Sequence, residues 1–145
     1  MKNIILTIAL IFSLSVSLPL TGYADDEADL NFHPKPSTEL LYRDIFVSML
    51  LPQIEKQVDQ YYSKILTMDP VVYPYYVFVE DAERLYGFRS FAFKVTLKVI
   101  PVVGPHIQVG VDRLVFEIRT PDVELKKYKH LKTEKLPPHW QHILK

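Results

Sequence analysis

The spacing of apolar residues changes once along this chain, and that change constrains the fold more than any other feature. Before Asp69-Pro70, apolar side chains recur every three or four residues, which is the period of a helix that buries one face. After it, they alternate within runs rich in β-branched and aromatic residues, which is typical of half-buried strands. This order predicts an α+β domain, with the helix laid on one face of an antiparallel sheet.

The predicted helix has a clear start and one interruption. Ser37 offers an N-cap, and Glu39 lies in the first turn, where the helix dipole favours an acid. Pro52 removes a backbone donor and restricts the residue before it, so we expect a kink or a break into two helices. The apolar stripe that should face the sheet consists of Leu40, Leu41, Ile45, Val47, Leu50, Leu51, Ile54, Val58, Tyr61, Tyr62 and Ile65.

Four strands are predicted, joined as a meander. In the third of them the alternation changes phase between Val111 and Leu114, and one extra residue at Asp112-Arg113 would restore a single buried face. We therefore expect a β-bulge there. The order of elements is reminiscent of cystatin-like or nuclear-transport-factor-like folds, by analogy only. The four predicted strands cover residues 71–80, 91–99, 107–118 and 123–135.

The first 24 residues show the three parts of a secretory signal peptide. Lys2 is the only charge before Asp25, an apolar run follows over residues 4–18, and Gly22 and Ala24 are small residues at the positions that a signal peptidase reads. The run is shorter than the roughly 20 residues that a membrane-spanning helix needs. We therefore expect cleavage after Ala24 rather than a retained anchor. A flexible lead-in over residues 25–36 and a single domain over 37–145 would follow.

Composition narrows the classes of partner. The chain has no cysteine, so an exported domain must be stabilised by apolar burial without disulfides, which fits a Gram-positive secretome. Basic and acidic residues number 17 each, which excludes the strong global field of a nucleic-acid-binding protein.

The first candidate site combines a turn with the predicted bulge, because bulges and sharp turns re-aim side chains and are frequent at functional sites. A turn histidine and a bulge aspartate could share a proton or hold a ligand. The alternative is an ordinary hairpin connection whose polar residues are solvated. The residues concerned are Gly104, Pro105, His106, Asp112 and Arg113.

Two surfaces give further candidates. The aromatic run Tyr73, Tyr75, Tyr76 and Phe78, which continues to Tyr86 and Phe88, could stack on sugars or peptides, although sheets favour such residues in any case. A basic patch could meet anionic polymers or lipid headgroups, or its lysines could simply prevent edge-to-edge aggregation of a solvated strand. The patch consists of Lys126, Lys127, Lys129 and Lys132, with His130 among them.

Catalytic and cofactor signatures do not occur. There is no Gly-x-Ser-x-Gly, no cysteine nucleophile and no glycine-rich phosphate loop. His139 and His142 amount to half a zinc site with no acid beside them. We therefore expect no metal or cofactor, and we name no catalytic residue.

Several short motifs resemble one family of small secreted bacterial proteins, catalogued as domain of unknown function 3888. The resemblance spans about residues 37–142 and implies export from a Gram-positive, spore-forming type of bacterium, but no activity. Its motifs are Leu50-Leu51-Pro52-x-Ile54, Tyr61-Tyr62, Val103-Gly104-Pro105-His106-x-x-Val109-Gly110-Val111-Asp112 and Leu136-Pro137-Pro138-His139.

These observations favour a non-enzymatic, extracellular or cell-wall-associated binding module. Its partner would be a wall polymer, a peptide or a surface protein. One alternative is a small hydrolase or isomerase that uses His106 and Asp112. Another is a secreted protease inhibitor, which the cystatin analogy suggests.

Overall fold

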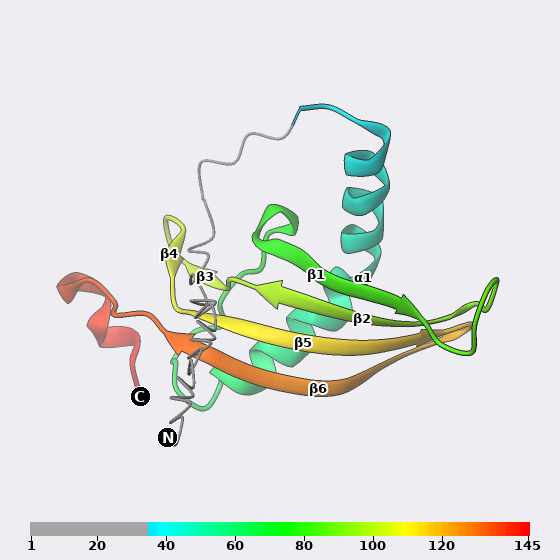
Figure 1. Ribbon diagram of the computed structural model, residues 1–145. Coiled ribbons are helices and arrows are strands. Elements are labelled where there is room, and N and C mark those ends of the chain that lie inside the picture. Colours follow the sequence, from blue (N-terminus) through cyan, green and yellow to red (C-terminus); the bar gives the residue numbers. More distant parts are fainter. Residues whose placement is uncertain (1–34) are drawn as a thin grey trace, which may run out of the picture. The chain divides into compact units, whose positions relative to one another are not determined.

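The computed structural model describes residues 35–145, which form one helix packed against a four-stranded sheet (Figure 1). The predicted signal peptide and most of the lead-in lie outside the described residues. The α+β architecture is as predicted. No helix in the described part of the chain has the length and apolar character needed to cross a membrane.

Helix α1 (Thr38–Tyr62) begins where the sequence predicts, because the Ser37 hydroxyl accepts a hydrogen bond from the backbone N–H of Leu40 at 3.0 Å. Pro52 lies inside the helix, which remains a single element and changes direction along its length (Figure 1). The kink is confirmed, and the break into two helices does not occur. Its buried stripe consists of Val47, Leu50, Ile54, Val58 and Tyr62. The predicted stripe was too long, because Leu41, Ile45 and Ile65 are exposed beyond the two ends of the part that the sheet covers.

The sheet is the predicted antiparallel meander, in the order β1-β2-β5-β6. Its strands are β1 (Val77–Arg84), β2 (Ala92–Val99), β5 (Gly110–Arg119) and β6 (Asp122–Thr133). Two short strands, β3 (Val102–Val103) and β4 (Ile107–Gln108), form a separate hairpin in the connection between β2 and β5. Short 3-10 helices precede and follow the sheet, η1 (Pro74–Tyr76) and η2 (Pro138–Ile143).

The pairing of β5 with β6 departs from the expected bulge. The register does shift between Val111 and Asp112, but the additional residue is Leu131 on β6, opposite this step. Strand β5 itself keeps a single phase, with Asp112 on the same buried face as Leu114 and Phe116. A carboxylate therefore stands in the core-facing row of β5, in place of an apolar side chain.

The core lies between α1 and one face of the sheet. Ile54 and Val58 from the helix, together with Leu97 and Leu114 from the central strands, are fully buried in one apolar cluster. This burial fixes the side of the sheet that faces the helix. The strand residues on the opposite side form the face that we call the outer face.

Candidate functional site

Asp112 is completely buried and is the centre of a polar cluster between helix and sheet. Its Oδ2 accepts a hydrogen bond, 3.0 Å long, from the hydroxyl of Tyr62, which is the last residue of α1. Its Oδ1 lies 2.7 Å from Nδ1 of His130, which pairs with Asp112 across β5 and β6. The buried Tyr128 hydroxyl approaches the same carboxylate without reaching normal hydrogen-bond geometry. Three elements thus meet at one carboxylate.

Aromatic rings and hydrogen-bonding groups fix the position of the His130 imidazole. The ring of Tyr61 stacks on it, with centroids 4.9 Å apart, and the ring of Tyr62 meets it edge-on at 6.1 Å. Its Nε2 lies 2.7 Å from Oγ1 of Thr133. A Cβ at Gly110 would stand 2.3 Å from the Tyr62 hydroxyl and 2.9 Å from Cε1 of His130. Glycine at this position is therefore what allows the tyrosine and the imidazole to reach Asp112.

Burial dominates the electrostatics of the cluster. Desolvation raises the pKa of Asp112 above its ordinary value, and the hydrogen bonds from His130 and Tyr62 oppose that rise. Burial also raises the pKa values of Tyr62 and Tyr128, and the nearby carboxylate adds to this effect, so both hydroxyls remain protonated at neutral pH. The imidazole of His130 connects the carboxylate on one side with the hydroxyl of Thr133 on the other.

The structure separates the residues of the first predicted site. Gly104, Pro105 and His106 are exposed in the β3–β4 turn, whereas Asp112 is buried beside His130. Arg113 lies on the outer face and pairs with Glu80. The histidine that meets Asp112 is thus His130, which the sequence places among lysines. The alignment of Asp112 with the apolar phase of β5 was the one signal in the sequence that could have indicated its burial.

The turn brings together two other predicted features. His106 stacks on Tyr73, with centroids 4.8 Å apart, and Tyr73 stacks in turn on Tyr75 at 5.2 Å, so that three rings lie in series. Gly104 and His106 both have positive φ, at 51° and 63°. The ring of Trp140 lies against Gly104, where a Cβ would come within 2.2 Å of it. We call Tyr73, Tyr75 and His106 the ring stack.

The outer face carries a row of cations in register. In the strand register, Lys98 on β2 lies directly opposite Arg113 on β5, and Arg113 lies directly opposite Lys129 on β6. Paired residues of an antiparallel sheet point to the same face, so the three side chains are neighbours. Lys127 and Lys132 lie on the same face of β6, opposite Val115 and Val111. We call Lys98, Arg113, Lys127, Lys129 and Lys132 the cationic row.

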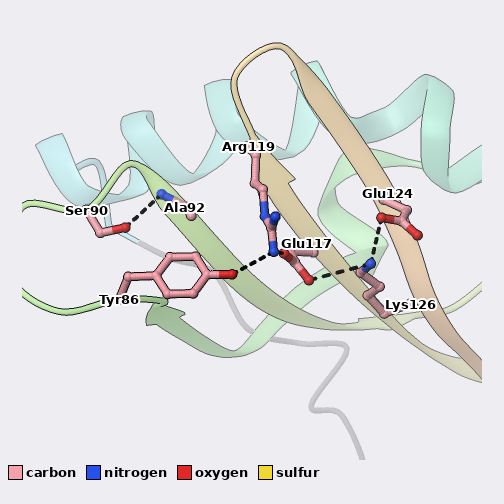
Figure 2. Close-up of polar contacts among 7 residues, drawn as sticks. All are labelled: Tyr86, Ser90, Ala92, Glu117, Arg119, Glu124 and Lys126. Atoms are coloured by element: carbon pink, nitrogen blue, oxygen red, sulfur yellow. Dashed lines mark hydrogen bonds and ion pairs between the residues drawn. The ribbon is translucent and has the colours of Figure 1, made fainter.

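The fourth lysine of the predicted patch belongs to a different network on the outer face. The ammonium of Lys126 lies 2.6 Å from a carboxylate oxygen of Glu124 and 3.6 Å from one of Glu117, and Glu117 also pairs with Arg119 (Figure 2). Arg119 donates a further hydrogen bond to the hydroxyl of Tyr86 at 2.8 Å (Figure 2). Charges at this end of the sheet therefore neutralise one another.

Within residues 35–145, no group of three or more His, Cys, Asp and Glu side chains has a geometry that could hold a metal ion. Nδ1 of His142 lies 2.9 Å from the backbone oxygen of His139, so the two histidines of the predicted half-site contact each other.

The family model described as "Protein of unknown function (DUF3888)" matches residues 42–132, which is well over half of the chain. The matched segment contains the whole Asp112 cluster except Thr133, and the whole cationic row. No curated protein and no solved structure matches this chain.

Proposed function

We propose that this chain, which belongs to the DUF3888 family of proteins of unknown function, is an exported binding module for an anionic polymer outside the cell. The observation that carries the proposal is the cationic row. Three cations side by side across neighbouring strands repel one another, and like charges directly opposite destabilise a sheet. This row of like charges lowers the stability of the free protein, and the binding of a polyanion that neutralises the charges would explain why the row is present.

Three members of the cationic row have a partner within the molecule, and one of them is Lys132, whose ammonium group lies 2.9 Å from a carboxylate oxygen of Glu134. Arg113 makes a two-pronged pair with Glu80, at 2.6 and 3.0 Å. The ammonium group of Lys98 lies over the ring of Phe78, 5.3 Å from its centroid. In the described part of the chain, none of the ion pairs involves Lys98, Lys127 or Lys129. These three ammonium groups remain available to an external anion.

The shape of the row suits a linear chain of charges. Neighbouring strands lie about 4.8 Å apart, so the row spans about 10 Å from Lys98 to Lys129. Lys127 and Lys129 are two residues apart on one strand, a separation of about 7 Å. Cations at these separations can contact several anionic groups of one flexible polymer chain. Binding of such a polymer does not require a buried pocket, because each lysine presents its charge at the surface.

A polymer fits the row better than a lipid bilayer does. Peripheral membrane binding joins cations to apolar side chains that enter the acyl region. Tyr86, Phe88 and Phe91 are large, exposed aromatic side chains in the β1–β2 connection, at the opposite end of the strands from Lys98. Of the other exposed aromatic side chains, Tyr42 lies on α1 and Tyr75 belongs to the ring stack. The cationic row itself contains no aromatic side chain, so the attraction that it provides is electrostatic.

Equilibrium binding of long-chain inorganic polyphosphate to the purified protein tests the proposal. The double variant Lys98→Gln, Lys129→Gln should weaken binding by about 25-fold, since each cation near an anionic surface contributes about 1 kcal/mol. The control is Lys56→Gln, Lys64→Gln, which removes the same charge from exposed positions on and just after α1 and should have little effect. Equal losses in the two variants would show net-charge attraction only. Tighter binding to vesicles with anionic lipids would replace the polymer by a membrane.

The ring stack favours a second ligand surface on the same module. Tyr75 is 54% exposed and His106 is exposed, so flat faces are open to solvent beside a turn with left-handed backbone. Such faces suit a sugar ring or a peptide. The single tryptophan, Trp140, lies against this turn, so its fluorescence should change when a wall glycan fragment binds, and His106→Ala should abolish the change. A change that persists in His106→Ala would place the ligand elsewhere.

A further inference from the structure

We propose that Thr133 is the nucleophile of an acyl-transfer site, with His130 as its general base and Asp112 as the residue that orients the imidazole. This activity is additional to polymer binding and does not depend on it. The inference rests on three groups in series: the hydroxyl of Thr133, the imidazole of His130 and the carboxylate of Asp112. Both links measure 2.7 Å.

The carboxylate determines which nitrogen of the imidazole is the base. An ionised carboxylate only accepts hydrogen bonds, so Nδ1 of His130 must carry the proton that it donates to Asp112. In the neutral imidazole, Nε2 is then the acceptor, and the hydroxyl of Thr133 donates to it. This is the direction of proton transfer that makes a hydroxyl nucleophilic.

The local structure holds this geometry in place. Tyr62 donates to the second oxygen of Asp112, and Tyr61 stacks on the imidazole. Gly110, opposite Thr133, leaves the space that the ring of His130 occupies. The additional residue at Leu131 turns the end of β6, which allows His130 and Thr133 to meet although they are three residues apart.

The reacting hydroxyl is accessible although the acid is not. Thr133 is exposed, the side chain of His130 is 19% exposed and Asp112 is fully buried. Solvent access therefore decreases along the series from nucleophile to orienting acid. A substrate would approach Thr133 from solvent, so the class that fits is an ester whose acyl group projects freely, such as an acylated polymer or an aryl ester.

The reaction balances with water as the only co-reactant. Oγ1 of Thr133 bonds to the acyl carbon while its proton moves to Nε2 of His130, and the alkoxide that leaves takes that proton. Water then attacks the acyl-threonine with His130 again as base, and the imidazolium returns that proton to Oγ1 of Thr133 as the bond between Oγ1 and the acyl carbon breaks. The products are the alcohol, the carboxylic acid and the free hydroxyl of Thr133.

A fluorophosphonate probe tests the nucleophile directly, because Oγ1 would form a bond to phosphorus, fluoride would leave and the proton would pass to His130. We expect one adduct per protein by intact mass, located on Thr133 by peptide mapping. Thr133→Ser should keep the adduct and Thr133→Val should lose it. His130→Gln should slow labelling at least about 100-fold, in line with the loss of a general base. Thr96→Val, on the outer face of β2, is the matched control and should label normally.

Two results would overturn the proposal. One is a wild-type protein that takes no adduct, or takes it on lysines and tyrosines instead of Thr133. The other is labelling of Thr133 at an unchanged rate in His130→Gln. Thermal unfolding of each variant shows whether it is folded, so a loss of fold in Thr133→Val cannot be mistaken for a loss of nucleophile. Thr133→Ser remains informative in that case, because it keeps the hydroxyl.

Discussion

Strand β5 contributes to two polar networks that differ chiefly in burial. Near its start, Asp112 has no exposed surface and joins Tyr62 and His130 between the helix and the sheet. Near its end, Glu117 and Arg119 belong to a network on the outer face, where the side chain of Arg119 is 52% exposed and that of Glu117 is 15% exposed (Figure 2). Both networks are built from charged groups and hydroxyls. The comparison shows how strongly the surroundings, rather than the residue types, determine what such groups contribute.

The physical reason is the cost of desolvation. A buried carboxylate has lost its water and depends on its protein partners, so removing part of the network leaves the remaining polar groups unsatisfied. Glu117 is itself only 15% exposed, but it lies on the outer face, where water can replace a partner that is removed. The Asp112 network should therefore be much more sensitive to substitution than the Glu117 network, and the following predictions test this difference.

The largest effect is expected for Asp112→Ala. The substitution leaves the hydroxyl of Tyr62 and the imidazole of His130 without their shared acceptor in a buried position. The free energy of unfolding, measured by urea denaturation, should fall by about 3–5 kcal/mol. Asp44→Ala is the control, because Asp44 is exposed and pairs only with its neighbour Arg43, and it should change stability by less than about 1 kcal/mol. Similar losses in the two variants would contradict the comparison.

A second effect should come from Gly110→Ala. The new Cβ would lie 2.3 Å from the hydroxyl of Tyr62 and 2.7 Å from the backbone oxygen of Lys132, so the end of α1 or the β6 backbone must move. We expect a loss of about 1–3 kcal/mol, the usual cost of overpacking. In Gly110→Ala combined with Tyr62→Phe, one of the three obstructing groups is absent, so the two losses should not add. Additive losses would mean that the clash lies with the backbone of Lys132 and the ring of His130.

The pH dependence of stability isolates the charge on Asp112. Burial raises the pKa of Asp112 above the 3.8 of an unperturbed aspartate, so the folded state binds the proton more tightly than the unfolded state. Its contribution to the free energy of unfolding is complete below 3.8 and is lost as pH rises through the raised pKa. Each pH unit between the two pKa values corresponds to about 1.4 kcal/mol. Asp112→Asn should remove this dependence.

The pKa of Asp59 is raised as well, by burial and by the nearby charge of Asp69. The measurement is therefore the difference between wild type and Asp112→Asn at each pH, since Asp59 contributes to both proteins. A difference that does not change between pH 3 and 7 would show that the pKa of Asp112 is the same in the folded and unfolded states.

The sequence predicts the frame of this molecule better than its polar centre. Ser37 predicts the start of α1, and the part of the apolar stripe from Val47 to Tyr62 predicts its buried face. The alternation from Phe91 to Val99 predicts β2. These signals are local. An acid within an apolar alternation suggests a change of phase, so the sequence predicts a bulge at Asp112, whereas the structure keeps Asp112 in the buried phase of β5.

The true arrangement depends on contacts that are distant in the sequence. The partners of Asp112 are Tyr62, 50 residues before it, and His130, 18 residues after it. Nothing near Asp112 in the sequence indicates either one, and His130 lies among lysines that suggest a solvated strand. In the same way, only the strand register places Lys98 and Arg113 beside the lysines of β6. The basic patch could thus be predicted in part, but not as a row.

The smallest effect is expected in the Glu117 network, for Arg119→Ala. The substitution removes the pair with Glu117 and the hydrogen bond to Tyr86, but Lys126 stays 3.6 Å from Glu117 and water can solvate what is left. The loss should be below about 1 kcal/mol, and it should shrink further in 1 M salt, where exposed charges are screened within about 3 Å. The loss in Asp112→Ala should persist in the same salt, since its groups are shielded from ions by burial. A salt-insensitive loss in Arg119→Ala would mean that the packing of its guanidinium group on the ring of Tyr86, rather than its ion pair with Glu117, stabilises this end of the sheet.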